Sequence, residues 1–82
     1  MKIILQPTTK LVIVKNDALG DGICCRVWEG TLENGDKCFA FINRVSLSAD
    51  STTESKKELF THLLQCNAPS AEVAQLATTL IL

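Results

Sequence analysis

The sequence predicts an α+β fold, an antiparallel sheet built on a long β-hairpin with two short C-terminal helices and an optional final strand. Three observations support this prediction. Two alternating arms flank Asn34-Gly35, apolar residues keep helical spacing after residue 53, and the last five residues, TTLIL, are apolar or β-branched. Because 82 residues support one small core, we expect a single domain over residues 1–82.

The N-terminal part of the chain is typical of β-structure. Residues 2–5 and 10–15 are rich in Ile, Leu and Val, and Gln6-Pro7-Thr8-Thr9 separates them. This pattern predicts two short strands or one strand broken at Pro7, because proline cannot donate to a ladder. Residues 16–22 have the Asn, Asp and Gly content of a loop.

The hairpin is predicted over about residues 23–32 and 37–47, with Asn34-Gly35 as the central residues of a type I′ turn. This turn sets a register whose opposed pairs are Trp28–Phe41, Gly30–Phe39, Arg26–Asn43 and Cys24–Val45. Trp28, Phe39 and Phe41 then form one aromatic cluster on one face, where Phe39 covers Gly30.

The opposite face of the predicted hairpin is also partly apolar and carries Glu29 and Arg44. We expect these two side chains to be solvated, or to meet each other or a neighbouring strand. If a partner covers this face, Arg44 would be buried with a carboxylate. A hairpin with two apolar faces does not stand alone in water, so we expect one face to meet another molecule, and we expect a homodimer.

Two helices are predicted after the hairpin. Ser51-Thr52-Thr53-Glu54 and Ser55-Lys56-Lys57-Glu58 both have the spacing of a capping box. A helix should follow to about Cys66, with an apolar stripe that comprises Leu59, Phe60, Leu63 and Leu64. Ser70 should cap a second helix that stops near Ala77, before the final strand. We expect both helices on one side of the sheet.

Composition narrows the classes of function. Apolar residues make up 46% of the chain, which argues against a disordered protein. The net charge is −1 and the largest basic cluster is Lys56-Lys57, so nucleic-acid binding is disfavoured. The apolar run at residues 3–5 ends at Gln6-Pro7, far short of a signal peptide, and no segment reaches the ~18–20 apolar residues of a membrane helix. We therefore expect no membrane association and a location in the cytoplasm of the host cell.

The sequence gives no indication of catalysis, of a cofactor or of a metal. No G-x-S-x-G, P-loop or H-E-x-x-H motif is present, and the aspartates of residues 16–22 lack the spacing of a calcium loop. Four cysteines and His62 raise a zinc hypothesis, but the C-x₂-C knuckle is missing, so buried or reduced thiols are the preferred interpretation. A Cys–His nucleophile pair ranks lower still. Cys24 and Cys25 should point to opposite faces of a strand.

The aromatic cluster is the best candidate for a binding site. One interpretation packs it in the core beneath Leu59, Phe60 and Leu63. The other leaves part of it exposed beside Arg26 and Asn43, a mixture enriched at interface hot spots and suited to stacking on a base. The candidate binding residues, for protein or ligand, are Arg26, Trp28, Glu29, Phe39, Phe41, Asn43 and Arg44.

Several segments resemble a family of small, mostly uncharacterised bacteriophage and prophage proteins: PTT at 7–9, RVWEG at 26–30, the strand CFAFINRVSL, APS at 68–70 and a final LIL. The likeness covers nearly the whole chain, with RVWEG as its specific element. The family has a shorter segment before RVWEG, so residues 16–22 look like an inserted loop. The family also carries a basic or histidine residue where this chain has Cys38-Phe39, and this departure argues against a shared ligand site.

The resemblance implies a phage context, in which small accessory proteins bind host or defence components stoichiometrically. Our leading hypothesis is a non-enzymatic protein that binds and inhibits a host or anti-phage-defence protein. The second is a module that sequesters a nucleotide-like signal on Trp28, Phe41 and Arg26. A virion assembly factor is the third, and an enzyme ranks last.

Overall fold

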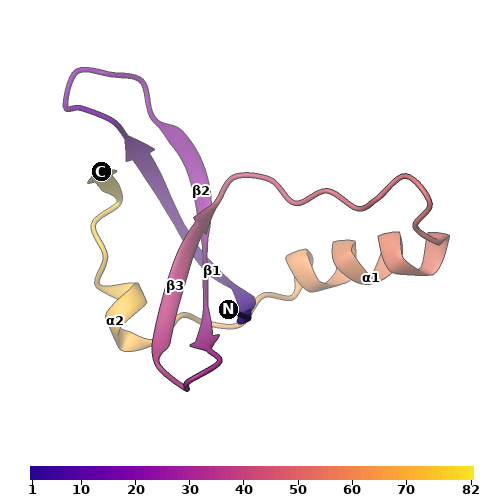
Figure 1. The fold of residues 1–82 in the computed structure, drawn as a ribbon. Helices are drawn as coiled ribbons and strands as arrows, with labels where there is room; N and C mark the ends of the chain where they lie inside the picture. Colours follow the sequence, from indigo (N-terminus) through magenta and orange to yellow (C-terminus); the bar gives the residue numbers. More distant parts are fainter.

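A computed structural model describes residues 1–82 and contains one four-stranded sheet with two helices (Figure 1). The strands are β1 (Ile3–Lys15), β2 (Ile23–Leu32), β3 (Lys37–Ile42) and β4 (Thr79–Ile81), and the helices are α1 (Thr53–Leu64) and α2 (Ala71–Ala74). The strand order is β3-β2-β1-β4, antiparallel except for the parallel pair of β1 with β4. The predicted α+β class and the final strand are confirmed.

β1 runs through Pro7 as one strand, with a bulge between Pro7 and Leu11 where the pairing with β2 shifts. A bulge is one of the few places where a strand tolerates proline. Thr8 lies in this gap and is fully buried. Its hydroxyl donates to the carbonyl oxygen of Val27 at 2.6 Å, so a side chain replaces a missing ladder bond.

The turn between β2 and β3 differs from the predicted type I′ turn. Leu32 pairs across the turn with Asp36, whose carbonyl oxygen accepts from the Leu32 N–H at 2.9 Å. The loop therefore has three residues, and within it only Gly35 has a positive φ, of 90°. Such loops combine a type I turn with a left-handed residue, whereas the predicted turn needs two residues with positive φ.

The longer loop shifts the register by one residue, so the predicted pairs are wrong. The observed pairs place Val27 opposite Phe41, Trp28 opposite Ala40 and Glu29 opposite Phe39. Because neighbouring side chains point to opposite faces, Trp28 is separated from Phe39 and Phe41. The predicted single aromatic cluster therefore does not exist.

The reason why position 30 requires glycine also differs from the prediction. It lies opposite Cys38 and not Phe39. On its other side β1 approaches so closely that a Cβ atom at Gly30 would lie 1.8 Å from the Ile4 carbonyl oxygen. The position requires glycine because of backbone contact, not because an aromatic ring covers it.

β3 ends at Ile42, so the predicted extension of this strand to residue 47 is wrong. Residues 43–66 instead form a projecting arm, which consists of an irregular segment followed by α1. Thr52 caps α1 by accepting from the Ser55 N–H, one residue after the predicted cap at Ser51. α1 extends away from the sheet, with its C-terminal end nearest to it (Figure 1), and none of its residues is buried.

The core lies between one face of the sheet and α2. Val12, Cys25, Val27 and Val73 form it, with Val14, Phe41, Leu76 and Leu80 packed against it. Ser70 caps α2 as predicted, but α2 ends at Ala74, short of Ala77. Leu63 of α1 lines a hollow with Trp28 on the opposite face, so the prediction of both helices on one side is wrong.

Very little of this chain is shielded from solvent. Only five of 82 residues are buried, and the accessible surface is 6188 Å². A compact monomer of 8.9 kDa would expose about 4,800 Å², so the chain has roughly 1,400 Å² in excess. Its radius of gyration, 14.2 Å, likewise exceeds the value of about 12 Å expected for a compact 82-residue domain.

Neither α1 nor α2 has the length and apolar character needed to cross a membrane.

Candidate docking surface

The sheet face opposite the core, here called the Trp28 face, is apolar and largely uncovered. The register places on it Leu5, Pro7, Leu11 and Ile13 of β1, Arg26 and Trp28 of β2, and Ala40 and Ile42 of β3. Leu11 and Ile13 are 50% and 37% exposed. Exposed apolar side chains that lie next to one another mark an interaction surface more often than scattered ones do.

Trp28 lies at the centre of the junction between this face and the arm. On one side it lines a hollow of about 150 Å³ with Ile42, Arg44 and Leu63. On the other side it lines a hollow of about 600 Å³ that reaches Leu5 of β1 and residues of α1. The indole is only partly buried, so a partner that enters either hollow meets its ring.

Four of the seven predicted site residues come together here. Arg26, Trp28, Asn43 and Arg44 all line the smaller hollow. The Nη1–H of Arg26 donates to the Thr8 carbonyl oxygen at 2.8 Å, and the Asn43 side-chain amide donates to the Cys24 carbonyl oxygen at 3.1 Å. Arg26 and Asn43 therefore help to hold the fold, whereas Arg44 is exposed and is the more available cation.

The other three predicted residues lie on the core face and do not join this surface. Phe39 and Phe41 contact each other edge-to-face, with ring centroids 5.8 Å apart. Phe41 also packs against the core. The predicted placement of Glu29 and Arg44 on a shared face is wrong, because Arg44 lines the hollow beside Trp28.

Glu29 has a structural partner. Its carboxylate accepts from the backbone N–H of Ser70 at 3.0 Å and from the Ser70 hydroxyl at 2.8 Å. Since Ser70 caps α2, this carboxylate fixes the start of α2 against β2. The sequence places Glu29 in solvent, beside Arg44 or against a neighbouring strand, because no local pattern connects residues 41 positions apart.

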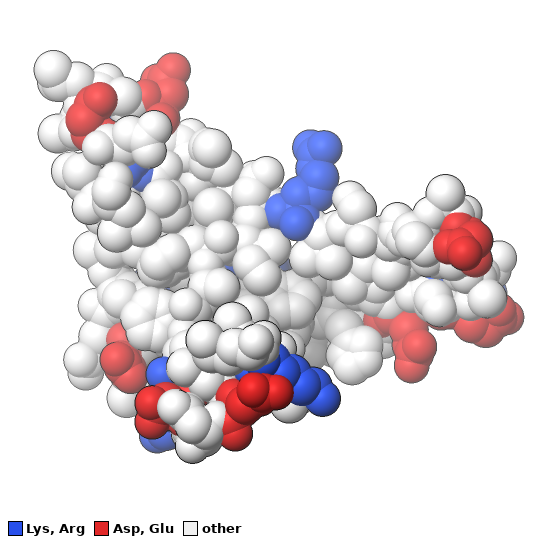
Figure 2. Space-filling model, in the orientation of Figure 1, with Lys and Arg blue, Asp and Glu red and all other residues white.

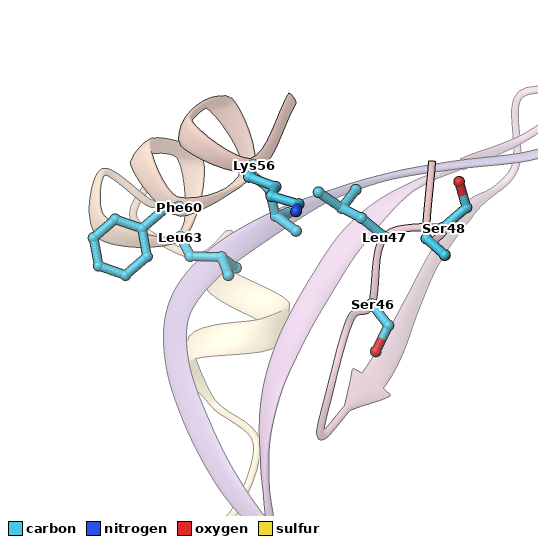
Figure 3. A pocket seen from close by; sticks show the side chains of 8 residues that line it. Ser46, Leu47, Ser48, Lys56, Phe60 and Leu63 are labelled. Carbon is cyan, nitrogen blue, oxygen red and sulfur yellow. The ribbon is translucent and has the colours of Figure 1, made fainter. Parts of the chain in front are cut away.

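The arm adds a second apolar region. Between α1 and the preceding segment lies an open hollow of about 480 Å³ lined by Leu47, Leu59, Phe60 and Leu63, among others (Figure 3). Leu47 points toward α1 while Ser46 and Ser48 point away from it (Figure 3). Phe60 and Leu64 are 64% and 71% exposed. The arm therefore carries unshielded apolar surface beside the Trp28 face.

A polar turn closes the tip of the arm. The Ser48 hydroxyl donates to the carboxylate of Asp50, and the backbone N–H of Ser51 donates to the Ser48 carbonyl oxygen at 3.1 Å. The hydrogen bond from Ser48 lowers the pKa of Asp50 below its ordinary value, with a further contribution from a backbone hydrogen bond. The tip is thus charged and solvated, in contrast to the apolar interior of the arm.

Sequence reasoning missed the contribution of β1 to this surface. Leu11 and Ile13 alternate with the buried Val12, and this period-2 pattern assigns them to one face without showing that the face stays open. One of the two interpretations packs the aromatic cluster beneath Leu59, Phe60 and Leu63. Leu59 and Leu63 do line hollows with Trp28, whereas Phe39 and Phe41 lie on the other face. Only the register and the projection of the arm show which residues meet.

The cysteines and His62 are distributed over β2, β3 and the arm. All four cysteines are unpaired, and Cys24 is exposed while Cys25 is buried, which confirms their opposite orientations. Nowhere do three His, Cys, Asp or Glu side chains gather as a metal ion would require. His62 is exposed on α1.

Charge is concentrated at the extremities of the molecule. In Figure 2 the acidic side chains lie on the tip of the β1–β2 loop, around the β2–β3 turn and along the arm. The surface between them is largely uncharged, apart from a basic side chain that projects between the sheet and the arm (Figure 2). This distribution suits contact with an apolar partner surface.

Comparison of the chain with family models, with curated proteins and with solved structures finds no match.

Proposed function

We propose that this chain is a non-enzymatic accessory protein of phage origin that binds a host or anti-phage-defence protein and inhibits it by occupying part of its surface. The observation that carries the proposal is the position of Trp28, between the sheet and the arm on a face that the chain leaves uncovered. The phage origin rests on the resemblance of the RVWEG segment and its neighbours.

The side chains that line the smaller hollow beside Trp28 indicate what kind of partner segment would fit it. Trp28, Leu63 and Ile42 supply apolar contact, and Arg44 supplies an accessible guanidinium beside them. Tryptophan and arginine at the centre of an apolar patch are the residues most enriched among interface hot spots. We therefore propose that the docked segment presents an apolar side chain next to a carboxylate, which Arg44 can bind through two parallel hydrogen bonds.

Two variants test this proposal after a partner is isolated from host lysate and purified. Arg44→Glu should weaken its binding about tenfold or more, since it replaces an attraction by a like-charge repulsion. Lys57→Glu makes the same charge change on the side of α1 that carries His62 and should leave binding unchanged. Titration calorimetry measures both. Equal binding of the two variants would contradict the proposed site, and a purified partner that keeps full activity when saturated would contradict inhibition.

The geometry gives less support to sequestration of a nucleotide-like signal. The hollow that brings Arg26 and Arg44 to Trp28 is about 150 Å³, whereas small-molecule sites measure roughly 300–1,000 Å³. The hollow of about 600 Å³ on the other side of Trp28 is large enough, but no Lys or Arg lines it to bind a phosphate. A thermal-shift series with cyclic and linear nucleotides separates the two functions. A ligand present at a hundred times its dissociation constant would add about 2.7 kcal/mol of stability, and we expect no shift.

A further inference from the structure

The outer edge of β3 is an unoccupied pairing site. The strand order places β3 at one edge of the sheet, and β3 is the strand nearest the viewer in Figure 1. On the opposite side of the sheet, β4 covers only Ile13–Lys15 of β1, and the bulge after Pro7 and the bridge from Thr8 to Asn67 interrupt the rest of that edge. β3 has six residues without a bulge, so it offers a continuous row of free backbone groups.

The register defines which backbone groups are free. Leu32 and Asp36 are joined by a backbone hydrogen bond, and hydrogen-bonded pairs recur at every second position of an antiparallel ladder. Cys38, Ala40 and Ile42 therefore direct their backbone groups toward β2. Lys37, Phe39 and Phe41 direct theirs toward the free edge.

This edge lacks the features by which proteins usually prevent pairing. Charged side chains, proline, bulges or a covering element block most natural edge strands. β3 contains one charged residue, Lys37 at its first position, and no proline. The surface that faces the viewer around β3 in Figure 2 is largely uncharged above the hairpin turn.

We infer that β3 pairs antiparallel with β3 of a second copy of this chain, around a two-fold axis at Ala40. The sequence is nearly symmetric about this residue, since Phe-Ala-Phe is flanked by apolar Cys38 and Ile42. In a two-fold antiparallel pair each strand lies against its own sequence, so the strand must be self-complementary. Pairing with an unrelated strand would not require this symmetry.

The proposed register is favourable on both faces of the joined sheets. Phe39 lies opposite Phe41 of the second copy in a hydrogen-bonded pair, and aromatic cross-strand pairs stabilise sheets. On the Trp28 face, the two Ala40 residues meet in a non-hydrogen-bonded pair without crowding. Lys37 lies opposite Asn43 of the second copy, so no like charges meet. The eight strands then form one continuous sheet.

A dimer would also bury part of the surface that the monomer leaves open. The chain exposes roughly 1,400 Å² more than a compact monomer of its mass, and Phe39 of β3 is one of its exposed apolar side chains. The pairing also leaves the Trp28 faces of both copies on the same side of the joined sheet. The proposed host contact does not use the outer edge of β3, so the dimer and the host contact can be contradicted independently of each other.

A cysteine placed at the two-fold axis tests the register. In a chain with Cys24→Ser, Cys38→Ser and Cys66→Ser, the variant Ala40→Cys should form a disulfide-linked dimer under mild oxidation, because facing Cα atoms in such a pair are about 4.5 Å apart. Ala49→Cys, exposed at the arm tip, should stay monomeric on a non-reducing gel. If Ala40→Cys cross-links no better than Ala49→Cys, the proposed pairing is wrong.

Sedimentation equilibrium tests the edge without cysteine chemistry. The wild-type chain should have twice the mass of the 8.9 kDa monomer, and Phe39→Lys should raise the dimer dissociation constant about tenfold or more. Phe60→Lys, the same change on the arm, should leave the dimer intact. A monomer at every concentration, or a dimer that Phe60→Lys dissolves and Phe39→Lys does not, would overturn the inference. If circular dichroism shows that Phe39→Lys is unfolded, the cross-link decides.

Discussion

Gly30 and Gly35 lie in the same hairpin but meet different constraints. At Gly30 a Cβ atom would clash with the backbone of β1, whereas at Gly35 the space is open and only the φ of 90° disfavours other residues.

We predict that Gly30→Ala destabilises the fold more than Gly35→Ala does. A residue with a Cβ in the left-handed region costs about 1–2 kcal/mol. The clash at Gly30 must displace a strand and should exceed that cost. Urea unfolding of both variants measures the difference, and equal losses would mean that β1 does not approach Gly30 as described.

Thr8 supplies a second prediction at this scale. Thr8→Val keeps the shape of the side chain but leaves the Val27 carbonyl oxygen without its donor, which should cost about 1–3 kcal/mol of unfolding free energy. Thr8→Ser retains the hydroxyl and should recover most of this loss in the same urea titration. If Thr8→Ser is as unstable as Thr8→Val, the methyl group and not the hydrogen bond is what matters.

At the scale of elements, the hairpin shows how far sequence patterns reach. The Asn-Gly pair and the alternating arms predict its existence, and both strands are present. The number of loop residues is not encoded in that pair, because Asn34 adopts a negative φ and only Gly35 is left-handed. One residue of slip puts Phe39 and Phe41 on the core face, and so separates two of the seven predicted site residues from Trp28.

The start of the arm, at residues 43–47, also differs from the prediction, because an apolar pattern alone does not fix strand pairing. Val45 and Leu47 continue the alternation of β3, so the sequence predicts a longer strand. Alternation indicates one apolar side but does not provide a neighbouring strand with which to pair. In the structure Leu47 faces α1 instead (Figure 3).

The attachment of α2 depends on Glu29. We predict that Glu29→Ala destabilises the protein by about 1.5–3 kcal/mol, the usual worth of hydrogen bonds to a charged group, and exposes the core at Val73. Glu29→Gln keeps an acceptor oxygen and should lose less. Hydrogen exchange at the Val73 and Ala74 amides would show the loosening directly, and protection equal to wild type in Glu29→Ala would contradict this role.

α1 should open far more readily than the sheet. It has no buried residue, and an isolated 12-residue helix is marginal in water. We therefore expect α1 amides to exchange much faster than those of β1 and β2. Phe60→Ala should change stability by less than about 0.5 kcal/mol, whereas Val27→Ala in the core should cost about 2 kcal/mol. Strong protection of α1 in dilute monomer would show that it packs more closely than described.

At the scale of the whole molecule, stability should depend on protein concentration. If folding and pairing through β3 are coupled, each tenfold rise in concentration should raise the melting temperature by about 3–5 °C. Differential scanning calorimetry over a hundredfold range measures this rise. Phe39→Lys should melt at one temperature throughout, and a wild-type melting point that does not move would exclude coupled assembly.

The class of fold could be predicted from the sequence, but the openness of the molecule could not. Patterns assign each apolar residue to a face, and they correctly indicate more apolar surface than two short helices can cover. They do not say that α2 covers one face, whereas α1 projects away and meets the other face only beside Trp28. Of the predicted site residues, Arg26, Trp28, Asn43 and Arg44 line one hollow, while Glu29 holds the start of α2.

The arm is anchored at both ends. At its start Asn43 donates to the Cys24 carbonyl oxygen, and just beyond its end the Asn67 carbonyl oxygen accepts from Thr9. Between these two points, no residue of α1 contributes to the core. Substitutions in the middle of the arm should therefore leave the four-stranded scaffold and its core intact.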